Sequence, residues 1–104
     1  MTIQFNTDKN LTVHEAFNSK LTDMLNKGLD RFRDNISRLE VHLSDENGQK
    51  NGLNDKRCLL EARVQGRTPV AVTADEQTHE LAVKAAILKL KNSLDTVFGR
   101  MQDR

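Results

Sequence analysis

Side chains that could act as a nucleophile, a general base or a metal ligand are few and scattered in this sequence. Cys58 is the only cysteine, and it stands among the apolar positions of an alternating stretch, where we expect a buried, inert thiol. The histidines His14, His42 and His79 lie far apart, and no pair has the spacing of metal ligands. We therefore predict no enzyme, no metal site and no cofactor. An enzyme using Cys58 or His42 is an alternative that an exposed Cys58 beside a base would favour.

Basic side chains recur at helical spacing in two parts of the chain. Those of the first part are seven and four residues apart, and two of the second part are seven apart, so each group can share one helix face. If the two helices lie side by side, their outer faces would form one basic stripe suited to phosphates. A solvated helix face is the alternative, because Asp23, Asp30 and Asp95 interrupt the pattern. The candidate phosphate-binding residues are Lys20, Lys27, Arg31, Lys84, Lys89 and Lys91.

The overall charge limits the kinds of binding that are possible. The 104 residues include 16 basic and 15 acidic ones, for a formal net charge of +1. Binding through general positive charge is therefore excluded, and an RNA-binding protein of this composition must sort its charges onto faces.

The sequence also indicates where the protein is found. The lone cysteine favours a reducing compartment, the N-terminus lacks signal-peptide regions, and no apolar run approaches the ~20 residues that span a bilayer. We expect a soluble, cytoplasmic protein.

Strands are predicted by alternation between apolar and polar residues. Residues 2–6, 37–44 and 56–65 alternate in this way, which is typical of half-buried strands. Val70 and Val72 indicate a short fourth strand. Residues 45–55 contain two Asn-Gly pairs and form a loop too long for a tight hairpin turn.

Two helices are predicted by their apolar stripes and by capping residues at their N-termini. A capping-box pattern at residues 12–15 begins the first helix, which we expect to end near Arg33. Gly28 either weakens this helix or marks a close contact. Asp75 or Thr78 would cap the second helix. Its apolar residues recur at spacings of four and three: Val83, Ile87, Leu90, Leu94, Val97 and Met101.

The resulting order is β-α-β-β-β-α. The economical assembly is an α+β two-layer sandwich, with two helices on one face of a four-stranded sheet. The first β-α-β unit should join parallel strands through a right-handed crossover, and the other strands should pair antiparallel. The second face of the sheet would be open to solvent. It would carry Arg38, Glu40, His42, Arg57, Glu61 and Arg63.

The element order and several stretches resemble the ribosome hibernation-promoting factor and ribosome-associated inhibitor family. One such stretch is Leu-Asp-Arg-Phe-Arg-Asp-Asn-Ile at residues 29–36, which leads into Leu-Glu-Val-His-Leu at 39–43. Others are Lys89-Leu90 with Leu94, and residues 55–63 with 66–73. The resemblance implies a single domain over residues 1–104, with a fold similar to double-stranded-RNA-binding folds.

The resemblance also implies a function. The family binds the small ribosomal subunit in the channel used by mRNA and tRNA, and blocks translation during stress or stationary phase. Its contacts are largely basic side chains on ribosomal RNA phosphates, which matches the candidate phosphate-binding residues above. An alternative is a protein-interaction module of the same fold, whose partner docks on the open sheet face.

The sequence departs from the family at several points. The hibernation factors carry Lys where Gly28 stands and an acidic residue where Leu88 stands, and the loop at 45–55 differs in composition. The chain ends just past the second helix, so we expect a short factor without the C-terminal dimerisation domain of long members. We expect it to be a monomer in isolation, with no membrane and no small-molecule substrate as partner.

Overall fold

The computed structural model describes residues 1–7, 15–45 and 55–102, with side chains described up to Gly99. The elements follow the predicted order β-α-β-β-β-α, with a short 3-10 helix, η1, after the first helix. They are β1 (Thr2–Thr7), α1 (Glu15–Gly28), η1 (Asp30–Phe32), β2 (Ile36–Asp45), β3 (Lys56–Val64), β4 (Val70–Glu76) and α2 (His79–Gln102).

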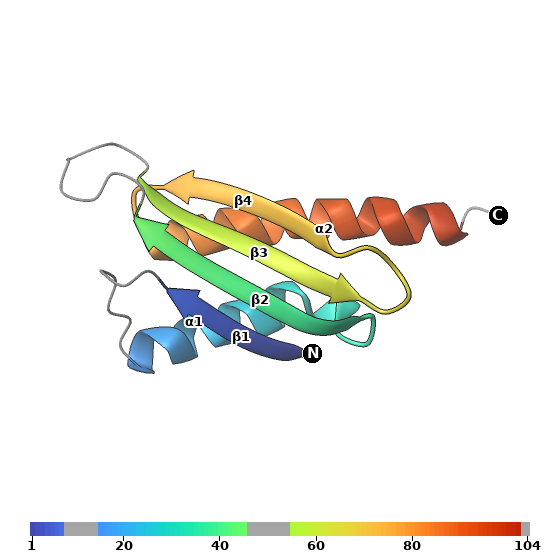
Figure 1. Cartoon of the computed structure of the whole chain (residues 1–104), viewed down its shortest axis with the longest axis horizontal. Helices are drawn as coiled ribbons and strands as arrows, with labels where there is room; N and C mark the ends of the chain where they lie inside the picture. Colours follow the sequence, from blue (N-terminus) through green and yellow to red (C-terminus); the bar gives the residue numbers. More distant parts are fainter. Residues whose placement is uncertain (8–14, 46–54, 103–104) are drawn as a thin grey trace.

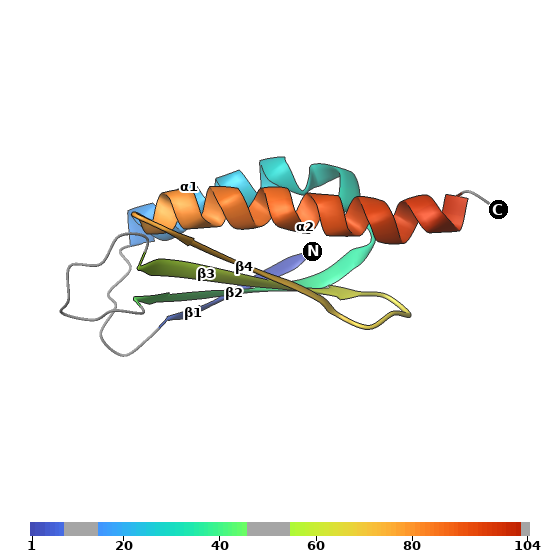
Figure 2. The same cartoon turned by 90° about the horizontal axis from the view of Figure 1, so that it is seen from above.

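The four strands form one sheet in the order β1-β2-β3-β4 (Figure 1). β1 pairs with β2 in parallel, and the pairs β2–β3 and β3–β4 are antiparallel. Both helices lie on the same side of the sheet, and the other side is left uncovered (Figure 2). The predicted two-layer α+β sandwich is therefore confirmed.

The core lies between the sheet and the two helices. Each long strand buries every second residue, as the alternation in the sequence predicts. Leu39, Val41 and Leu43 of β2 are buried, and so are Cys58 and Leu60 of β3. The helices complete this core with apolar residues spaced three and four apart: Leu21, Leu25, Ala82, Val83, Ala86, Ile87, Leu90 and Leu94.

The first helix is shorter than predicted. α1 ends at Gly28, and the chain continues as a 3-10 turn in which the Phe32 amide donates to the Leu29 carbonyl at 2.9 Å. Glycine is a poor helix former, so the regular helix stops there. Phe32 still points into the core and stacks on Phe98, with ring centroids 5.9 Å apart. Apolar spacing therefore continues past the residue where helical hydrogen bonding ends.

The fourth strand is longer than the short strand predicted. β4 continues to Glu76 because it pairs with β3 along its whole length, and Asp75 lies opposite Arg57. Asp75 is therefore not the helix cap. Thr78 takes that role, because its Oγ1 accepts a hydrogen bond from the Leu81 amide at 3.1 Å.

Some expectations fall on residues outside those described. The capping-box prediction rests on residues 12–14, and the loop prediction rests mostly on residues 46–54. Within residues 1–7, 15–45 and 55–102, no helix combines the length and apolar character needed to cross a bilayer.

Candidate functional site

The two helices run side by side in the same direction. Near their beginnings, Lys20 Nζ lies 2.6 Å from Glu80 Oε1. Further along, Gly28 comes so close to Ile87 that an added Cβ would lie 2.6 Å from Ile87 Cγ2. The close contact that the sequence suggested for Gly28 is therefore present, at the residue where the regular helix ends. α1 and α2 thus lie in register, and their outer flanks form one surface.

Basic residues from both helices line this surface. Glu80, Lys84, Lys91 and Asp95 are spaced four, seven and four apart, so they share one stripe of α2. Because Glu80 and Asp95 reach basic residues of the first helical segment, this stripe faces α1. Its two lysines therefore approach those of α1. We call this set the interhelical basic cluster: Lys20, Lys27, Arg31, Lys84 and Lys91.

Acidic residues neutralise part of the cluster. The hydrogen bond from Lys20, with the charge of Lys84, holds the pKa of Glu80 below its usual value. Arg31 pairs with Asp95, and its guanidinium also lies 4.7 Å from the centroid of the Phe32 ring. The surface is thus of mixed charge. Three members make no ion pair with any residue that the structure describes: Lys27, Lys84 and Lys91.

Lys89 lies apart from the cluster. Its Nζ donates a hydrogen bond of 2.8 Å to the Thr73 carbonyl of β4, on the flank of α2 away from α1. The structure therefore brings together the other candidate phosphate-binding residues but not Lys89. Its predicted contact with phosphate stays a prediction.

The open sheet face carries the charged residues predicted for it, and they form a network. Glu40 lies at its centre with a side chain only 15% exposed. Its carboxylate lies 3.3 Å from Arg63, 3.7 Å from His42 and 4.0 Å from Arg38. Arg63 also approaches Glu61 at 3.8 Å. Most cations on this face therefore already have a carboxylate nearby.

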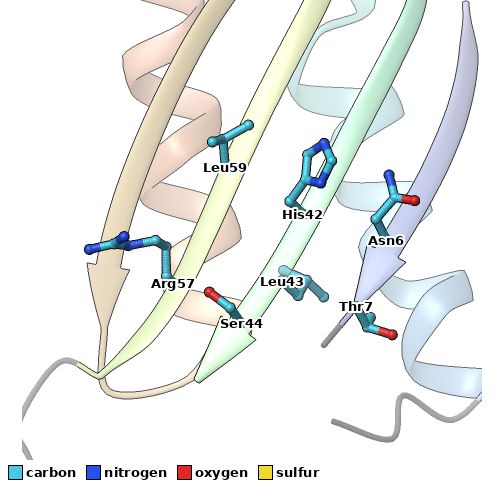
Figure 3. A pocket seen from close by; sticks show the side chains of 7 residues that line it. All are labelled: Asn6, Thr7, His42, Leu43, Ser44, Arg57 and Leu59. Atoms are coloured by element: carbon cyan, nitrogen blue, oxygen red, sulfur yellow. The ribbon is translucent and has the colours of Figure 1, made fainter. Parts of the chain in front are cut away.

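One end of the open face is hollowed, as Figure 3 shows. Asn6, His42 and Leu59 occupy matching positions on β1, β2 and β3 and form a row across the sheet. The hollow has a volume of 420 Å³, and its further lining includes Arg57, which pairs with Asp75 at 2.8 Å. Sequence reasoning did not single out Asn6. Its outward position on the first alternating stretch was the available signal.

Cys58 has the environment of a structural residue. It is fully buried between the sheet and the helices, and desolvation raises the pKa of its thiol to about 12. A nucleophilic cysteine needs the thiolate form, which this site disfavours. In the described part of the chain, no group of His, Cys, Asp and Glu residues could hold a metal ion.

Comparisons with known proteins point to one family. Residues 5–102 match the family described as sigma 54 modulation protein / S30EA ribosomal protein. The N-terminal domain of Protein Y from Thermus thermophilus has a similar structure, with a TM-score of 0.71 and 21% sequence identity; the match covers 93% of this chain and 99% of that one. No curated relative matches the sequence.

A ribosomal subunit interface protein from Coxiella burnetii is also similar. Its TM-score is 0.72 at 22% sequence identity, and the match covers 95% of this chain and 99% of that one. At such identities the likeness establishes the fold. It confirms that the β-α-β-β-β-α arrangement is shared with proteins of this kind.

Proposed function

The chain belongs to the sigma 54 modulation protein / S30EA ribosomal protein family, and on that premise we propose that it binds the ribosome and holds it idle. The site is small-subunit ribosomal RNA, and the bound protein blocks the channel used by mRNA and tRNA. Residues 1–104 act as one domain and as a monomer, in the cytoplasm, during stress or stationary phase. The mechanism is steric, so no catalytic residue takes part.

The interhelical basic cluster is the proposed contact surface. Lys27, Lys84 and Lys91 project from neighbouring helix flanks without ion-pair partners among the described residues. Such side chains suit phosphates, which accept charge-assisted hydrogen bonds from ammonium groups. These three lysines, together with the family match, are the main support for RNA as the partner.

The mixed charge of the surface shapes the expected binding. With a net charge of +1, affinity must come from local contacts rather than from the field of the whole protein. Lys20 and Arg31 contribute only if phosphates displace Glu80 and Asp95. We therefore expect modest affinity, with a salt dependence of roughly one power of salt concentration for each phosphate contact.

Co-sedimentation with ribosomes tests the proposal. The protein should pellet with the small subunit at low salt and inhibit translation in a purified system. The double variant Lys84→Glu with Lys91→Glu should bind at least about tenfold more weakly, and the slope of its salt dependence should fall by about one for each lysine that binds a phosphate.

Arg67→Glu is the control for a charge reversal outside the cluster, at half the change in net charge, because Arg67 is an exposed residue of the turn between β3 and β4. It should leave binding nearly unchanged. If the wild-type protein stays in the supernatant at low salt, the proposed function is wrong. If binding survives the double reversal intact, the helix surface is not where RNA binds.

A second candidate function is protein interaction through the open sheet face. The hollow around His42 and Leu59 favours it, because the anchor side chains of a protein partner fill pockets at an interface. Leu59→Glu separates the two possibilities. Loss of ribosome binding in Leu59→Glu, with retention in the double lysine variant, would move the binding surface to the sheet.

A further inference from the structure

The two edge strands of the sheet, β4 and β1, differ in how they are protected from pairing with another strand. At the β4 edge, α2 packs on the strand, Pro69 precedes it, and Lys89 donates to the Thr73 carbonyl. Lysine, proline and a covering helix are devices that discourage further strand pairing. β1 forms the opposite edge (Figure 1). In the described ranges, no strand pairs with its outer side.

A groove runs between this free edge and α1. Its floor is apolar and is made by Met1, Ile3 and Phe5, which pack against the core but stay partly exposed. Its wall is a row of uncharged polar side chains at every fourth residue of α1: Asn18, Thr22 and Asn26. The volume is 620 Å³, which is of the size that holds several side chains.

The groove is rich in hydrogen-bond acceptors. Asn18 Oδ1 is buried and accepts no hydrogen bond from any residue that the structure describes. Thr22 donates its hydroxyl proton to the Asn18 carbonyl, at 2.8 Å, so its oxygen is left as an acceptor. Glu15 and Asp23 add exposed carboxylates to the wall, whereas the cation Arg33 lies 3.6 Å from Asp30. The groove therefore suits a partner that brings donors and positive charge.

We propose that the β1–α1 groove binds an extended, basic polypeptide segment, which adds to β1 as a fifth strand. The backbone of that segment would pair with the free edge of β1. On the side of the new strand that faces α1, the methylene stems of lysine or arginine side chains would cover Ile3 and Phe5, and their charged ends would reach Glu15, Asp23 and the unpaired oxygen of Asn18. The side chains that alternate with them would point to the open sheet face. This site is separate from the interhelical basic cluster, which lies on the other flank of α1.

A defined peptide probes the site in the full-length protein. It alternates Lys or Arg with Val over about seven residues, close to the length of β1. In amide NMR spectra we expect shifts confined to β1 and to the side-chain amides of Asn18 and Asn26. A peptide with Glu in place of each basic residue tests charge. A basic peptide with alternate N-methylated amides tests strand pairing, and should bind at least about tenfold more weakly because its backbone donors are blocked.

Protein variants complete the test. Glu15→Lys with Asp23→Lys should weaken the basic peptide about tenfold, while Asp34→Lys, an exposed reversal outside the groove, should not. Equal binding of acidic or N-methylated peptides would overturn the proposal. So would the absence of shifts at millimolar peptide. Ribosome binding is measured separately with the lysine variants, so either proposal can fail alone.

Discussion

Gly28 is the residue on which the spacing of the two helices depends. An added Cβ would lie 2.6 Å from Ile87 Cγ2, and Ile87 is buried in the core. Gly28→Ala should therefore lower the free energy of unfolding by about 1–3 kcal/mol, because overpacking outweighs the gain in helix propensity. Urea unfolding measures this change.

Two further variants show whether the contact between Gly28 and Ile87 causes the loss of stability in Gly28→Ala. Gly99→Ala adds a Cβ that meets nothing within 4 Å, so it should stabilise α2 by up to about 1 kcal/mol. Ile87→Leu removes the branch that Gly28 faces and should reduce the cost of Gly28→Ala. If that cost is the same in both backgrounds, the close approach does not explain the glycine.

Burial of Cys58 has a chemical and a thermodynamic consequence. Because its pKa is raised to about 12 from 9.0, the native thiol should not react with a disulfide reagent at pH 8. Its labelling rate should instead follow global unfolding. The buried, neutral thiol contributes to the free energy of unfolding in full below pH 9. This contribution declines as pH rises toward 12, since the thiol ionises in the unfolded chain before it ionises in the native protein. Fast labelling of the native protein would contradict this.

At the scale of elements, the start of α2 depends on one hydroxyl. Thr78 Oγ1 accepts from the Leu81 amide at 3.1 Å, so Thr78→Ala should lower the free energy of unfolding by about 1 kcal/mol. Thr78→Ser should keep most of the stabilisation, because serine also has a hydroxyl that can accept this hydrogen bond. Thermal unfolding of the three proteins compares them, and equal midpoints would show that the cap contributes nothing.

Elements were predictable where burial repeats with a fixed period. Leu39, Val41 and Leu60 face the core because a half-buried strand must alternate. The end of α1 was not predictable in this way, since Phe32 keeps the apolar spacing of a helix while its backbone forms a 3-10 turn. The pattern of apolar residues indicates which face of an element is buried. It does not indicate whether the backbone forms α-helical or 3-10 hydrogen bonds.

The candidate site was predictable only in part, for a related reason. Seven-residue spacing correctly placed Lys84 and Lys91 on one stripe of α2. It did not show that Glu80 and Asp95 share that stripe and reach Lys20 and Arg31 across the helix pair. Contacts between distant segments depend on how helices pack, which spacing within one helix does not specify.

For the whole molecule, the interhelical ion pairs should restrain RNA binding. Glu80→Gln with Asp95→Asn frees Lys20 and Arg31 and raises the net charge by two. If the proposed function holds, this variant should bind small subunits several-fold more tightly at low salt, with a steeper salt dependence. Sedimentation over a salt series measures both quantities.

The same charge change made elsewhere is the control. Asp34→Asn with Glu61→Gln also raises the net charge by two, but Asp34 follows the first helical segment and Glu61 lies on the open sheet face, so neither change touches the ion pairs of the helix surface. An equal gain from this variant would mean that overall charge, rather than the freed side chains, governs binding.

The parallel pairing of β1 with β2 also orders events during synthesis. β1 is the first strand to leave the ribosome, yet its register partners begin at Arg38, beyond the whole of α1. The antiparallel strands β2, β3 and β4 need only neighbouring segments, so they can assemble among themselves. We expect β1 to dock late, after closure of the longest loop in the sheet. In hydrogen exchange, its amides should be the first in the sheet to open.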